Sequence, residues 1–208
     1  MTALGKIAGV ALVAASLSGC LLSQLPPPDT IQLAPVPGVA LPHKARVMIF
    51  MGENDLNRNM TIQLTRFQDE ETKVKEGVAL AKAARTVLGK GFEQVEVNTS
   101  AIRPQLVVKL SGKAAWARLD ATMKVSCALD VWTSDGIPVG LFGSRYDAER
   151  SDYTTELEAA FGQCLKKPVE ELLRSPNLAR LAGTGFRDPP AKAVEDWMRG
   201  LGTLTPLR

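Results

Sequence analysis

The 208-residue sequence has very little of the chemistry on which hydrolases and metalloenzymes depend, since it contains a single histidine, His43. A Ser-His-Asp or Cys-His arrangement would have no base except His43, which lies beside a proline-rich segment. A zinc site is equally disfavoured, because His43 is the only histidine. Gly136, Gly140 and Gly143 form no nucleotide-binding pattern at a strand-to-helix junction. We therefore expect no enzyme activity, no cofactor and no metal.

An excess of charge of one sign is also lacking. The formal net charge is +3, and basic residues alternate with acidic ones, as in residues 66–75. This mixture argues against nucleic-acid binding, which requires a basic patch. Aromatic residues make up only 5% of the chain, so the core must consist mainly of Val, Leu, Ile and Ala. Acid pairs such as Glu156 with Glu158 fall on helical positions expected to face solvent, and a solvated surface explains them better than acid–base catalysis.

Residues 1–19 have the pattern of a secretory signal peptide. Lys6 supplies one positive charge, residues 7–15 form an apolar stretch, and small residues precede Cys20. The stretch is too short for a permanent membrane span, which needs about 20 apolar residues. The sequence therefore predicts an export signal that is removed.

The end of this signal, Leu17-Ser18-Gly19-Cys20, resembles the lipobox of bacterial lipoproteins. The resemblance implies cleavage before Cys20 and acylation of its thiol and its new amine, which together give stable anchoring. The residue after Cys20 is Leu21 rather than Asp, which by the same resemblance implies delivery to the outer membrane, facing the periplasm. Residues 20–42 follow as a proline-rich stretch, which we expect to form a semi-rigid tether several nanometres long.

Lipidation of Cys20 leaves two further cysteines in an oxidising compartment. Cys127 alternates with apolar residues on one face of an expected strand, and Cys164 lies on the apolar stripe of an expected helix. The sequence therefore predicts a disulfide between Cys127 and Cys164 where the helix covers the sheet. The alternative is a pair of buried free thiols.

The folded part, residues 43–174, is expected to be an α+β domain: a two-layer sandwich with a mostly antiparallel sheet and two helices on one face. The first two strands are expected to pair as a hairpin, and an Asp-Gly turn at 133–136 is expected to join the last two. Residues 175–208 are expected to be a loop-rich tail with a short amphipathic helix at 191–201. The expected strands are 46–51, 60–67, 92–97, 105–110 with a continuation to 116 as an alternative, 121–132 and 137–146, and the expected helices are 70–88 and 153–173.

Two tryptophans are candidate partner-binding residues. Trp132 falls on the outward side of its strand if Cys127 points inward, and Trp197 lies on the apolar side of the short helix. The alternatives are that the tail or a loop covers Trp132 and that the helix packs back on the domain.

The layout of a proline-rich tether, an opening strand, a helix ending in Gly89 and a later hairpin is similar to small periplasmic lipoproteins of the YajG type. It is also similar to lipoproteins that form rings in curli and exopolysaccharide export. This second resemblance rests on layout and assigns no site. Together with the lipobox it implies a non-enzymatic subunit of an envelope assembly, secretion or surface-appendage complex, with a protein partner or as a homo-oligomer. The alternative is a periplasmic binding module for a lipid, a glycan or a peptidoglycan strand.

Overall fold

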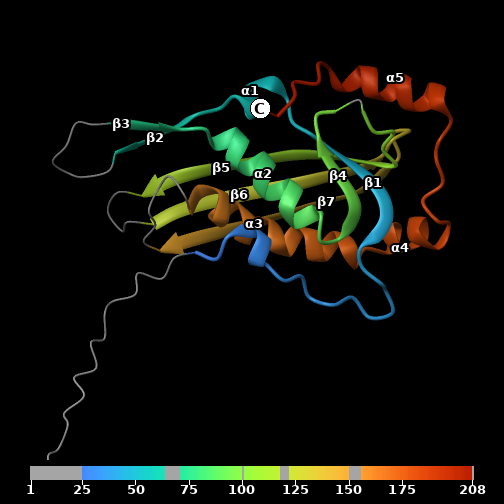
Figure 1. Cartoon of the computed structure of the whole chain (residues 1–208), viewed down its shortest axis with the longest axis horizontal. Coiled ribbons are helices and arrows are strands. Elements are labelled where there is room, and N and C mark those ends of the chain that lie inside the picture. Colours follow the sequence, from blue (N-terminus) through green and yellow to red (C-terminus); the bar gives the residue numbers. More distant parts are fainter. Residues whose placement is uncertain (1–24, 64–70, 100, 118–121, 150–155, 208) are drawn as a thin grey trace, which may run out of the picture.

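The computed structural model describes residues 25–63, 71–99, 101–117, 122–149 and 156–207, so the lipobox and Cys20 lie outside the described residues. Figure 1 shows two layers, a main sheet and the helices that cover it. The strands are β1 (His43–Phe50), β2 (Met60–Gln63), β3 (Glu71–Val74), β4 (Phe92–Val97), β5 (Leu106–Ala117), β6 (Thr122–Thr133) and β7 (Pro138–Glu149). The helices are η1 (Pro28–Thr30), α1 (Glu53–Leu56), α2 (Glu76–Leu88), α3 (Glu156–Leu173), α4 (Pro176–Gly183) and α5 (Ala191–Leu201).

The domain is α+β, as predicted, but its main sheet is mixed rather than mostly antiparallel. The strand order is β4-β1-β5-β6-β7, and β1 runs parallel to both of its neighbours. β5, β6 and β7 are antiparallel and form the half of the sheet that the prediction describes correctly. The difference arises because the chain returns from β1 to β4 through α2, and a crossover through a helix brings the next strand back parallel.

The predicted hairpin between the first two strands is wrong. β1 pairs with β4 and β5, whereas β2 pairs with β3, with Met60 opposite Val74. Residues 71–74, predicted as the first turn of a helix, form β3 instead, so α2 begins at Glu76. Alternating residues identify a strand but not its partner, and a short segment such as Glu71–Val74 becomes a strand when a partner is available.

Helices α2 and α3 pack on one face of the main sheet and enclose the core (Figure 1). The inward residues of β6, including Met123, Val125 and Leu129, alternate with outward ones as the sequence predicts. Cys127 of β6 and Cys164 of α3 form a disulfide, with 6.2 Å between their Cα atoms. The disulfide therefore joins the helical layer to β6, the strand next to the β7 edge of the sheet.

The segment predicted as a tether is in part a component of the domain. Pro28 and Ile31 are buried, and the missing side chain of Gly162 leaves room for Ile31 on α3, since a Cβ there would lie 2.9 Å from Ile31 Cδ1. The Ala34 N–H donates a hydrogen bond of 2.8 Å to Glu170 Oε1. Prolines favour extended chain, and an extended chain with apolar residues can lie along a helix as well as in solvent. Residues after Pro28 therefore do not act as a spacer.

The C-terminal segment contains the predicted amphipathic helix as α5, with the predicted bounds. Leu178, Phe186 and Val194 are buried and attach the segment to the domain. Within the described residues, no helix combines the length and the apolar character needed to cross a bilayer.

Candidate interaction face

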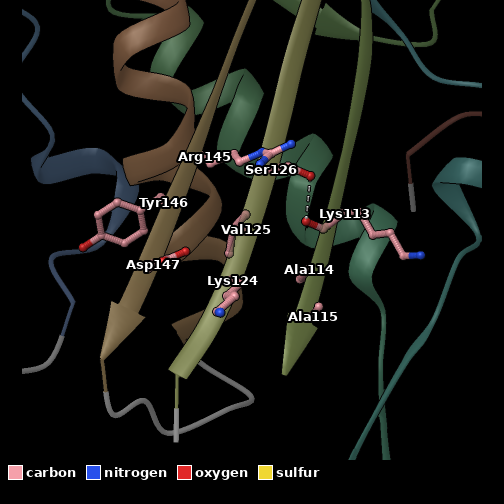
Figure 2. A pocket seen from close by; sticks show the side chains of 9 residues that line it. All are labelled: Lys113, Ala114, Ala115, Lys124, Val125, Ser126, Arg145, Tyr146 and Asp147. Carbon is pink, nitrogen blue, oxygen red and sulfur yellow. Dashed lines mark hydrogen bonds between the residues drawn. The ribbon is translucent and has the colours of Figure 1, made fainter. Parts of the chain in front are cut away.

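The sheet has a second face, opposite α2 and α3, which we call the open face. Figure 2 looks onto part of it, with the helices behind the strands. Apart from Val107, its outward residues on β5–β7 are half-buried or exposed, in contrast to their inward neighbours. These residues are Lys109, Ser111, Lys113, Ala115, Lys124, Ser126, Ala128, Asp130, Trp132, Leu141, Gly143, Arg145 and Asp147. The open face is therefore a surface of small and charged side chains with few large apolar ones.

The two predicted partner-binding residues lie together at one end of the open face. The ring centroids of Trp132 and Trp197 are 6.2 Å apart, and the Lys109 Nζ lies 5.0 Å and 5.6 Å from them. We call Lys109, Trp132 and Trp197 the Trp cluster. Trp197 also packs on Gly136, where a Cβ would approach its ring to 2.5 Å. In this arrangement α5 packs back on the domain, and contact of either tryptophan with a partner stays a prediction.

Beside the Trp cluster, the open face carries a small second apolar layer. Met48 and Val107 are neighbours on β1 and β5 and are completely buried. The alternation of both strands turns them away from the main core, because Val47 and Ile49 point into it. This corner of the open face is therefore covered, whereas the region toward the ends of β5 and β7 is not.

The uncovered region contains a hollow of about 690 Å³ that we call the basic hollow. Lys113, Lys124 and Arg145 surround it, and among the described residues that line it Asp147 is the only acid (Figure 2). Its floor is low because β6, the strand between β5 and β7, carries the small residue Ser126 there. The Ser126 hydroxyl donates a hydrogen bond of 3.3 Å to the Lys113 carbonyl. The other lining residues are Ala114, Ala115, Val125 and Tyr146. Within the described ranges, none of these four charged side chains forms an ion pair.

The largest exposed apolar side chains lie on the β6–β7 hairpin. Leu141 is 73% exposed on β7, and Ile137 is 54% exposed in the turn. The sequence analysis missed both. For Leu141 the signal was present, because the predicted hairpin and an inward Cys127 place Leu141 on the outward side of its strand.

The remaining polar residues of interest serve the fold. His43 is buried between the rings of Phe92 and Phe186, with centroid distances of 5.8 Å and 5.6 Å. Burial lowers the pKa of His43 from its ordinary value of 6.5. Glu76 is also buried and accepts a hydrogen bond of 2.7 Å from Arg58 Nε. No group of three or more His, Cys, Asp and Glu side chains suited to a metal ion occurs within the described ranges.

The sequence matches no protein-family model and no curated protein. Among solved structures, it has a partial likeness to protein XCC0632 of Xanthomonas campestris, of family DUF330. The TM-score is 0.44 and the identity 15%, over 76% of this chain and 94% of that one. A second partial likeness is to a dodecamer of PelC from Paraburkholderia phytofirmans, with a TM-score of 0.38 and 17% identity, over 67% of this chain and 96% of that one. No function is transferred from either protein.

Proposed function

We propose that this protein is a lipoprotein, anchored in the outer membrane through acyl chains on Cys20, and acts as a non-enzymatic subunit of a cell-envelope complex. The proposal for the anchor rests on Leu17-Ser18-Gly19-Cys20. The proposal for the subunit role rests on the open face, which exposes the large apolar side chain of Leu141 and lacks a covering layer along most of β6 and β7.

Leu141 is the observation that carries the subunit role. A leucine that is 73% exposed near the start of a strand buries little apolar surface in the isolated domain. Burial of a leucine side chain contributes about 1.5–3 kcal/mol, which is a typical contribution of a central residue in a protein interface. Gly143, the next outward residue of β7, is exposed and has no side chain, so a partner can approach the backbone closely there.

The proposal is tested by extracting the protein from its own membranes in mild detergent through a tag at Arg208. Native mass and composition are then measured for the wild type and for the Leu141→Lys variant. We expect a homo-oligomer or a stoichiometric envelope protein with the wild type, and its loss with Leu141→Lys.

The matched control is Ala179→Lys on α4, which adds the same charge at an exposed position away from the open face. This variant should retain the complex. A monomer from the wild type, or a complex that survives Leu141→Lys intact, would contradict the subunit role at this face.

The alternative function, a binding module for a lipid or a glycan, is favoured by one feature. A groove of about 660 Å³ runs between α5 and the residues before β5, with Ile102, Met198 and Leu204 among its apolar lining residues. A monomer that extracts with a bound lipid or glycan, released by Met198→Lys, would support this alternative in place of the first.

A further inference from the structure

The basic hollow lies at the end of the sheet where the chain enters the domain. Leu25 is half-buried against the core. The chain that follows Leu25 starts beside the end of β7 in Figure 1, and η1 then packs on α2 and α3. Figure 1 and Figure 2 both show this neighbourhood. The three cations of the basic hollow stand on the same end of β5, β6 and β7.

The covalent chain allows only a short separation between this end and the proposed anchor. An extended chain advances at most about 3.6 Å per residue, so Leu25 lies within about 18 Å of Cys20. The residues that follow Leu25 do not lengthen the link between Cys20 and the domain, because they are held on it. Ile31 is in the core, and the Lys90 ammonium donates a hydrogen bond to the Asp29 carbonyl. With Cys20 acylated, this end of the domain is held next to the lipid headgroups.

The positive charges of the basic hollow would be attracted to anionic lipid headgroups at this position beside the membrane. Lys113, Lys124 and Arg145 are exposed and have no ion-pair partner in the described part of the chain, so their charges are available to an outside anion. Asp147 opposes them with one negative charge. The small floor residues Ala115 and Ser126 let a headgroup approach the bases of these long side chains.

We propose that the basic hollow binds the headgroups of anionic phospholipids in the membrane that holds Cys20. This inference rests on the proposed lipidation, which supplies the short separation. Each lysine or arginine near an anionic surface strengthens binding about fivefold. Three cations therefore add to the acyl anchor a second attachment, which favours one orientation of the domain. The domain is then held in one orientation, with the basic hollow against the membrane.

The inference is tested on the lipidated full-length mature protein, reconstituted in vesicles of phosphatidylcholine alone or with phosphatidylglycerol. Lysine side chains are labelled with an acylating reagent, and the labelling rate of each lysine is measured by mass spectrometry. We expect phosphatidylglycerol to slow the labelling of Lys113 and Lys124 about threefold or more, given the strength of each contact. Lys167 and Lys192, which are exposed on α3 and α5, serve as controls and should keep their rates. Protection should disappear at 1 M salt, where the Debye length falls to about 3 Å.

A second measurement separates the lipid contact from the anchor. The mature Cys20→Ser chain, which cannot be acylated, is floated with vesicles that contain phosphatidylglycerol. We expect Lys113→Gln and Lys124→Gln each to weaken binding about fivefold, and Lys167→Gln to leave it unchanged.

Equal labelling of Lys113 and Lys124 in both kinds of vesicle would overturn the inference. Equal protection by soluble glycerol phosphate at the same headgroup concentration would also overturn it, because the ligand would then be a free phosphate. If the mature protein fails to float with phosphatidylcholine vesicles, the proposed anchor is wrong. The flotation of the Cys20→Ser chain still decides whether the basic hollow binds anionic lipid.

Discussion

His43, the single histidine of the chain, is a pH-dependent part of the core rather than a catalytic base. Its burial between Phe92 and Phe186 lowers its pKa below 6.5, so the folded protein resists protonation at a pH where the unfolded chain accepts a proton. The unfolded state then binds more protons, and the free energy of unfolding falls as the pH drops below about 6.5.

The prediction concerns the variant His43→Phe, which removes this titration from a site already lined by aromatic rings. We expect the free energy of unfolding of the wild type to fall between pH 6.5 and pH 5 relative to that of His43→Phe. Urea unfolding across this range measures the difference. A constant difference between the two proteins would show that His43 titrates alike in the folded and unfolded states.

Glu76 is a buried carboxylate whose hydrogen-bond partners come from two other segments. It accepts hydrogen bonds from Arg58 Nε and from the Ala114 N–H of β5, and Arg58 also donates to the Gly112 carbonyl. Removal of a buried partner leaves the others unsatisfied, so we expect Glu76→Ala to lower the free energy of unfolding by about 3 kcal/mol. The control is Glu171→Ala, because the Lys167–Glu171 pair is exposed and contributes less than about 0.5 kcal/mol. Urea unfolding of both variants checks the contrast, and equal losses would refute it.

At the scale of elements, α5 depends on the Trp cluster for its position. An isolated helix of this length is marginal in water, and the residues of α5 that contact the domain are few. We therefore expect Trp197→Ala to speed amide hydrogen exchange in α5 about tenfold or more, while exchange in α2 and α3 stays unchanged. Lys192→Ala on the outer side of α5 is the control. Unchanged exchange in Trp197→Ala would mean that other contacts hold α5 in place.

Sequence patterns predicted the elements whose stabilising contacts are local or alternate regularly. The amphipathic pattern of α5 and the apolar alternation of β4 have the bounds that the structure shows. The pairing of β1 was not predictable in the same way, because its partners come from distant segments and any apolar strand satisfies the same pattern. The packing of Ile31 on α3 could not be predicted for a similar reason, since it depends on the space left by Gly162 on a helix far along the chain.

The candidate site was predictable only in part. Cys127 and Cys164 were paired correctly from strand alternation and helical spacing. The basic hollow could not be predicted, because its charged residues come from three strands. Only the strand register, which places Lys113 opposite Ser126 and Ser126 opposite Arg145, brings these residues together. The contact between Trp132 and Trp197 likewise depends on where α5 folds back.

At the scale of the whole molecule, the two regions for which we propose roles lie apart on the open face. The basic hollow lies where the chain enters the domain, and Leu141 lies toward the β6–β7 turn. Leu141 and Asp147 are six residues apart on one strand, which corresponds to about 20 Å. With the basic hollow against a membrane, Leu141 is held at a distance from the lipid, where a partner in the envelope can contact it.

The most direct test of this account is photocrosslinking in living cells, with a photoreactive amino acid in place of Leu141 and, as a control, in place of Lys167 on α3. We predict one discrete adduct from position 141, either with a second copy of the chain or with one envelope protein, and no such adduct from position 167. The absence of an adduct at position 141, or the same adducts from both positions, would contradict the proposal that the open face docks a partner.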